Sequence, residues 1–185
     1  MASHAEGEST SASSNFAHAE GLRSQATGIA SHAEGFETIA SIENSHAEGR
    51  NTIASATASH AEGYYTEASG NYSHAEGYKN DVSGEKSHSE GSNNTVYGNI
   101  AHVEGQGNVV GEAGKDGSFN GYKSHAEGSG NTVTGNSSHA EGINNTVSAN
   151  NAHAEGQDNT VEGMNAHAEG KSNKSIGLHA HTEGQ

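Results

Sequence analysis

The chain contains no cysteine, no tryptophan and only eight lysine and arginine residues. The lack of cysteine excludes disulfides and thiolate metal sites. Because so few cations stand against 23 Asp and Glu residues, with a formal net charge of -15, nucleic acid is not expected as a partner. No apolar run is long enough to span a membrane as a helix. The opening residues Met1–His4 carry neither a basic region nor an apolar core, so no signal peptide is predicted in this chain.

Large apolar side chains are also scarce. Hydrophobic residues make up 29% and aromatic residues 5% of the 185 residues. Such a composition alone is typical of disorder. If the chain folds, its core must be thin and built from Ala, Ser, Val and Thr.

What the chain has instead is a repeat. The phrase Ser-His-Ala-Glu-Gly, or a near copy, recurs thirteen times with a period of 14 residues. Only the step from His102 to His125 differs, with 23 residues and therefore an insertion of nine. A strict short period predicts one small unit stacked many times, in which the His and Glu of each phrase form ladders. The ladder residues are His4, Glu6, His18, Glu20, His32, Glu34, His46, Glu48, His60, Glu62, His74, Glu76, His88, Glu90, His102, Glu104, His125, Glu127, His139, Glu141, His153, Glu155, His167, Glu169, His181 and Glu183.

Each 14-residue unit is predicted to be a coil of two short β-strands. We number its positions from the residue before the His, so that Ser3 is position one. Positions one, three and five form one small-residue face, and positions eight and ten form a second, which together enclose a narrow interior. The recurrent glycines at positions five and twelve are expected to bend the turns with positive φ. The same glycines, and the lack of a 3.6-residue apolar period, argue against helix.

The repeat fills the chain, so residues 1–185 are predicted to form a single all-β repeat domain. The insertion, near 112–120, is expected to leave one coil as a surface loop without breaking the stack.

The His and Glu positions point away from the interior, yet they do not vary as an ordinary solvent face does. A uniform face favours a uniform neighbour, of which the simplest is the same face of another copy around a cyclic axis. We expect each imidazole to bond a Glu of a neighbouring chain. Charged pairing would raise the His pKa and lower the Glu pKa, and stability would peak at mildly acidic pH.

Two other uses of the ladder were weighed. Imidazole and carboxylate suit Zn, Ni or Cu, but pairing of His with Glu occupies the ligand lone pairs, so no metal and no cofactor is predicted. An enzyme needs differentiated groups in one cleft. Thirteen equivalent His and Glu pairs, with no nucleophile motif, predict no catalytic residue and no enzyme.

The unit resembles the head repeat of trimeric autotransporter adhesins, and related repeats occur in phage and prophage fibre proteins. The family phrase is Ser-Val-Ala-Ile-Gly, which here reads Ser45-His46-Ala47-Glu48-Gly49. The resemblance implies a left-handed parallel β-roll assembled as a trimer. It also implies that the Val and Ile positions face the trimer axis, so that a His and Glu network replaces an apolar seam.

The expected role is a structural fibre protein, as an extracellular filament or a cell-surface or virion fibre. Repeats run from Ser3 to Gly184, so bare end coils predict head-to-tail stacking of homotrimers; the alternative is a segment of a longer fibre. A second alternative is an adhesin head or phage tail-fibre module that binds a host-surface receptor, and deletion of the loop would discriminate the two roles. The nine-residue loop is the best candidate for contact with the receptor. The outer aromatics Phe36, Tyr64, Tyr65, Tyr78, Tyr97 and Tyr122 could also serve, but their scatter along the sequence favours ordinary surface decoration.

Overall fold

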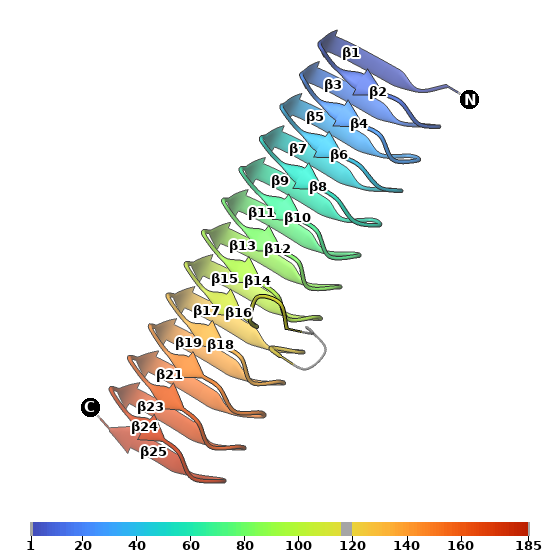
Figure 1. Cartoon of the computed structure of the whole chain (residues 1–185). Coiled ribbons are helices and arrows are strands. Elements are labelled where there is room, and N and C mark those ends of the chain that lie inside the picture. The colour runs from blue at the N-terminus through green and yellow to red at the C-terminus, as the bar shows by residue number, and fades with distance from the viewer. Residues whose placement is uncertain (1, 116–119, 185) are drawn as a thin grey trace. The chain divides into compact units, whose positions relative to one another are not determined.

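The computed structural model describes residues 2–115 and 120–184. All regular structure in these residues is β-strand, and no helix occurs among them. The chain divides into two compact units, Met1–Lys86 and Ser87–Gln185, which we describe separately. In each unit the chain winds in flat coils with one long and one short strand per coil (Figure 1). The expected all-β solenoid of parallel two-strand coils is confirmed, whereas its handedness and trimeric state stay predictions.

In the first unit, drawn blue to green in Figure 1, each long strand begins at the His of a phrase. The long strands are β1 (His4–Glu8), β3 (His18–Leu22), β5 (His32–Phe36), β7 (His46–Arg50), β9 (His60–Tyr64) and β11 (His74–Tyr78). The short strands are β2 (Ser11–Ala12), β4 (Gln25–Ala26), β6 (Ile39–Ala40), β8 (Ile53–Ala54), β10 (Glu67–Ala68) and β12 (Asp81–Val82).

The second unit repeats this plan and ends on a long strand. Its long strands are β13 (His88–Ser92), β15 (His102–Gln106), β17 (His125–Ser129), β19 (His139–Ile143), β21 (His153–Gln157), β23 (His167–Lys171) and β25 (His181–Gly184). Its short strands are β14 (Thr95–Val96), β16 (Val109–Val110), β18 (Thr132–Val133), β20 (Thr146–Val147), β22 (Thr160–Val161) and β24 (Lys174–Ser175).

Within each unit, every strand pairs in parallel with its equivalent in the next coil. The register places His46 opposite His60 in the first unit and His139 opposite His153 in the second. A slip of one residue would turn the buried Ala of each phrase outward and the His inward, so the alternation of the phrase fixes this register.

The interior is one thin layer of small side chains. In the first unit Ala47 and Ala54 are 0% exposed, and Ser45 and Thr52 are also buried. These residues occupy positions three, ten, one and eight, as expected. The glycines at position five, by contrast, are only half-buried and do not belong to the core, which corrects the sequence-based prediction.

In the second unit the interior is held by a ladder of asparagines at position eight. Asn131 donates from Nδ2 to the carbonyls of Glu127 and Gly142, at 2.7 and 3.0 Å. Its Oδ1 accepts the backbone N–H of the next asparagine, Asn145, at 2.9 Å. Each asparagine therefore satisfies backbone groups of its own coil and of the next one, where no water reaches them.

The turns differ from the prediction. They bend at positions seven and fourteen, where non-glycine residues such as Arg23 and Ala30 hold φ at 57° and 54°. Position-twelve glycines such as Gly28 lie outside the left-handed region. Position-five glycines have positive φ but lie inside the long strands: Gly49 has φ 110°, and a Cβ there would come within 2.2 Å of the carbonyl oxygen of Gly63. Close stacking, rather than turn formation, therefore requires glycine at this position.

The insertion leaves the coil after β16, and its residues 116–119 lie outside the described part of the chain. On its two sides, the N–H of Gly111 donates to Val133 at 2.8 Å and the N–H of Gly121 donates to Thr134 at 3.0 Å. Both ends are thus held by the same following coil. The pairing of His102 with His125 keeps its register across the insertion.

Candidate functional site: a histidine and glutamate face

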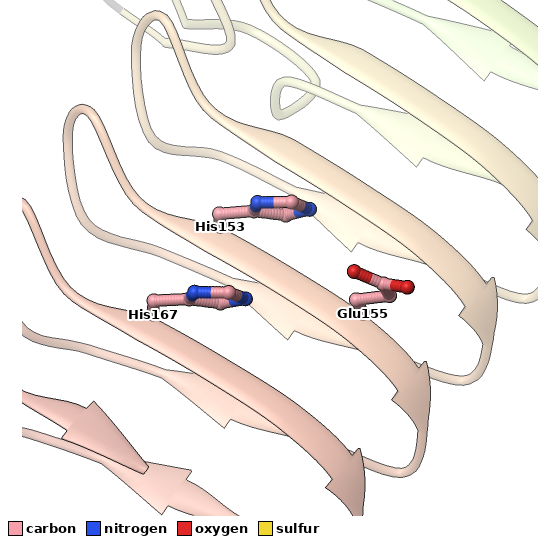
Figure 2. Close-up of side chains that lie close together, drawn as sticks. All are labelled: His153, Glu155 and His167. Carbon is pink, nitrogen blue, oxygen red and sulfur yellow. The ribbon is translucent and has the colours of Figure 1, made fainter. Parts of the chain in front are cut away.

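The His and Glu of each phrase lie on the outer face of the long strands, and in every long strand except β1 and β25 a fully buried residue lies between them. Figure 2 shows this arrangement for His153, Glu155 and His167, which project from the same face of two neighbouring strands. On inner coils such as that of His46 and Glu48, the His side chain is 34% exposed and the Glu side chain 49%. We call this outer surface of the long strands, formed by the ladder residues of each unit, the His–Glu face.

In the first unit the imidazoles form a continuous stack. Ring centroids are 4.8 Å apart between His18 and His32, and 4.5 Å apart between His46 and His60. The corresponding interplanar angles are 10° and 19°. The spacing follows from the parallel register, because equivalent residues of adjacent coils are separated by one strand spacing, ~4.8 Å.

Each His of the first unit also lies beside the Glu of its own strand. From His32 to His74, the distance between the His Nε2 atom and the Glu oxygen grows from coil to coil. The Nε2 atom of His32 is within 3.3 Å of a Glu34 oxygen and forms a hydrogen bond. The matching distance is 3.5 Å for His46 and 3.7 Å for His60, and neither of these makes a hydrogen bond among the described residues. The buried Nε2 atoms of His46 and His60 are thus left without a hydrogen-bond partner among the described residues.

The second unit also carries a stack of imidazoles, but its rings from His125 to His167 make no hydrogen bond to a Glu in the described residues. His125, His139, His153 and His167 stack at centroid distances of 4.7, 4.8 and 4.7 Å. The Nε2 atoms of all four are buried and find no hydrogen-bond partner in the described residues. The last ring, His181, turns nearly perpendicular to His167, at 74°.

In the single chain, the surroundings of the stack lower the pKa of His60. The pKa of His60 is lowered from 6.5 to about 4, chiefly because burial penalises the imidazolium, and then because His46 and His74 repel its charge. The carboxylates of Glu48 and Glu76 act in the opposite direction without prevailing.

The same direction holds in the second unit. The pKa values of His125, His139 and His153 are lowered, with burial as the first cause and neighbouring imidazoles as the second. In the single chain the pKa values of these His residues are thus lowered, and the rise expected from pairing with a Glu of a neighbouring chain stays a prediction. Each imidazole lies against like groups above and below it, whereas the Glu side chains remain half exposed to solvent.

The lowered pKa values of His60, His125, His139 and His153 favour uncharged imidazoles at these positions. A neutral ring offers one N–H donor and one lone pair, so it can bond a neutral or acidic partner or ligate a cation. The structure gathers the predicted ladder residues on one face of each unit. Their position at a trimer axis stays a prediction.

A second surface feature escaped the sequence-based interpretation, in which the outer aromatics were scattered. Phe36, Arg50, Tyr64 and Tyr78 lie in register at position six of successive long strands, and we call them the aromatic stripe. The Arg50 guanidinium is 4.9 Å from the Phe36 ring and 5.6 Å from that of Tyr64. Tyr64 and Tyr78 stack in parallel at 5.4 Å. Their shared repeat position was the signal that could have revealed them.

The other outer aromatics, Tyr65, Tyr97 and Tyr122, do not occupy position six and therefore lie outside the aromatic stripe. Tyr65 holds φ at 56° in a turn and contacts Tyr64 edge-on, and it lines a groove of about 450 Å³ beside β6 and β8. Tyr97 and Tyr122 belong to the second unit.

Comparison with known proteins assigns no relative. No protein-family model matches the chain, and no curated protein matches it. In the part of the chain that the structure describes, no helix has the length and apolar character needed to cross a membrane.

Proposed function

We propose that the protein is a structural fibre module: a trimer of left-handed parallel β-rolls that stack end to end into an extracellular filament. The observation that carries the proposal is the uniform His–Glu face. Its residues are the same in every coil of both units, while position nine on the outer face of the short strands varies freely. That position holds Ser11, Gln25, Ile39, Ile53, Glu67 and Asp81 in the first unit.

Unpartnered imidazole nitrogens support contact between copies through this face. The Nε2 atoms of His46, His60, His125 and His139 are buried and have no hydrogen-bond partner among the described residues. Buried polar atoms in proteins are nearly always hydrogen-bonded. A half-exposed Glu of a second copy supplies an acceptor for an imidazole N–H. Cyclic symmetry brings equivalent layers together, so the same contact can repeat along the face.

End-to-end growth would join the outermost long strands of this sequence. Within the described residues, β1 pairs only with β3 and β25 pairs only with β23. In the proposed filament, the outer edges of β1 and β25 would pair their backbone N–H and C=O groups with strands of the next trimer. A repeated contact between unlike ends does not close on itself and yields a filament.

The trimer is tested by charge reversal within one coil. Glu62→Lys places a cation on the His–Glu face, whereas Glu67→Lys makes the same change on the outer side of the short strand β10. Mass photometry is expected to show trimers for the native chain and for Glu67→Lys, and dissociated or weakened trimers for Glu62→Lys. A native chain that is a stable, folded monomer would rule out the trimer.

The filament is tested by electron microscopy of the concentrated native chain. Fusion of a folded domain before Met1 should block elongation and leave single trimers. Native protein that remains as single trimers at high concentration would reject end-to-end growth while leaving the trimer intact.

The aromatic stripe favours a second candidate function, that of an adhesin head or phage tail-fibre module. Four adjacent position-six side chains offer ring faces and a cation to a host-surface ligand. Paired Tyr64→Ser and Tyr78→Ser substitutions should abolish binding to host cells, while Tyr122→Ser should not. Equal binding by all variants would remove the stripe from consideration.

A further inference from the structure

One group in the second unit differs from the rest of the His–Glu face. His153 and His167 stack with their planes only 3° apart and their centroids 4.7 Å apart. The possible ligand atoms of His153, His167 and Glu155 all lie within 4.8 Å of one another. In Figure 2 the Glu155 carboxylate lies beside the two rings, on the strand that carries His153.

We propose that His153, Glu155 and His167 form a binding site for one divalent transition-metal ion of the zinc class. Two imidazole nitrogens and one carboxylate oxygen would be the protein ligands, and water would complete the coordination. Two His and one Glu are a donor set that zinc accepts in proteins, with a fourth position open to solvent.

The free lone pairs at this place are the first argument. The prediction of no metal rested on His–Glu pairing, which occupies the imidazole nitrogens. That premise holds for His32, which bonds Glu34 at 3.3 Å. It does not hold for His153 and His167, whose Nε2 atoms have no hydrogen-bond partner in the described residues and are shielded from water.

Geometry is the second argument. Zinc lies ~2.0–2.2 Å from nitrogen and oxygen ligands, so tetrahedral ligand atoms are roughly 3.3 Å apart. The three side chains must therefore close by about 1 Å each, and the two parallel rings must tilt so that their in-plane lone pairs meet at one ion. Rotation about χ on a partly exposed face allows both movements. Glu155 is exposed and the two rings are half-buried, so no core residue has to move.

Local charge is the third argument. The carboxylates of Glu155, Glu141 and Glu169 all act on His153, so a cation at this place is surrounded by negative charge from three successive strands.

The number of bound ions is limited because adjacent coils share ligands. Each inner imidazole lies between one imidazole above it and one below it. Two ions in neighbouring layers would compete for the same His and repel each other. The expected occupancy is therefore one ion at this place and not a row of ions along the face.

The site is complete within one chain, so it does not depend on the proposed trimer. The experiment is zinc titration of the metal-free, full-length native protein at neutral pH by calorimetry, with native mass spectrometry for stoichiometry. One zinc per chain is expected. Cobalt(II) in place of zinc should give the visible absorption of a tetrahedral site.

Three variants locate the ligands. Glu155→Gln should weaken zinc binding at least tenfold, and combined His153→Gln and His167→Gln at least a hundredfold. The matched control, His32→Gln, removes a paired imidazole from the same type of face and should bind zinc as the native chain does. Far-UV circular dichroism checks the fold of each variant. If the double His variant is misfolded, Glu155→Gln decides the question, because it keeps both rings.

Several results would overturn the proposal. The first is no zinc binding at micromolar concentration, and the second is a loss of zinc affinity in His32→Gln equal to that in the double His variant. The others are unchanged zinc affinity in Glu155→Gln and a stoichiometry of many zinc ions per chain instead of one. Mass photometry of the metal-free protein reads the oligomeric state separately. A trimer without zinc binding rejects the metal site alone, and a zinc-binding monomer rejects the trimer alone.

Discussion

Removal of a single asparagine from the interior ladder of the second unit should be among the most damaging substitutions in the chain. Asn145 is fully buried, and its Nδ2 donates to the carbonyls of Glu141 and Gly156 at 2.7 and 3.0 Å. Its Oδ1 accepts the N–H of Asn159 at 2.9 Å. Asn145→Ala deletes all of these bonds and puts nothing in their place.

The magnitude follows from the groups left behind. The N–H of Asn159 loses its partner in an interior that excludes water, which costs about 1–3 kcal/mol, and two carbonyls of paired strands each lose one of the bonds they accept, at about 0.5–1.5 kcal/mol each. The sum, roughly 2–6 kcal/mol, is a large part of the ~5–15 kcal/mol that stabilises a typical domain. The stability of Asn145→Thr should lie between that of the native chain and that of Asn145→Ala, because one hydroxyl can replace only part of the hydrogen bonding of the amide.

Urea unfolding followed by circular dichroism measures the loss, and hydrogen exchange of the Asn159 amide locates it. That amide should be protected in the native chain and exchange much faster in Asn145→Ala. The control is the adjacent exposed residue, Asn144→Gly, which keeps the left-handed backbone, φ 55°, and loses only a 3.3 Å bond to Asp158. It should cost under ~1 kcal/mol, as surface bonds do. If Asn145→Ala costs no more than Asn144→Gly and leaves exchange unchanged, the asparagine ladder does not stabilise the coil.

Three further predictions concern the strands, the stack and the first unit. Gly49→Ala should unfold or severely destabilise the first unit in thermal melts, because its Cβ would meet the Gly63 carbonyl at 2.2 Å. Gly107→Ala has open space around it and should cost only the strain of its left-handed backbone, φ 66°, roughly 1–2 kcal/mol. Because the pKa of His60 falls from 6.5 to about 4, its stabilising contribution is complete above pH 6.5 and is lost as pH falls toward 4. The melting temperature should therefore be lower at pH 4.5 than at pH 7.5, and less so in His60→Gln; a maximum at mildly acidic pH would contradict the lowered pKa. Thr52→Asn, which replaces a buried hydroxyl with no hydrogen-bond partner among the described residues, should extend the asparagine pattern and raise stability by about 1 kcal/mol in urea unfolding.

The candidate site shows where sequence reasoning succeeded. The outward position of His46 and Glu48 and the burial of Ala47 between them follow from strand alternation alone. The close approach of His153, Glu155 and His167 was not predicted, and a metal was weighed and rejected because pairing of every His with a Glu was assumed. Side-chain rotation decides whether Glu155 lies closer to His153 or between the rings of His153 and His167. A repeat with the same residues in every unit does not specify that rotation.

The sequence by itself determined the coil, its parallel register and the composition of its thin core. Identical residues every 14 positions make each residue the natural partner of its own copy, and alternation decides which side is buried. Only the tertiary structure decided where the coil bends and how the imidazoles are charged. The turns use residues such as Arg23 and Ala30 at positive φ, because the stack rather than the residue type imposes that conformation. The lowered pKa of His60 depends on ring spacing and lost hydration, which exist only once the coils are stacked.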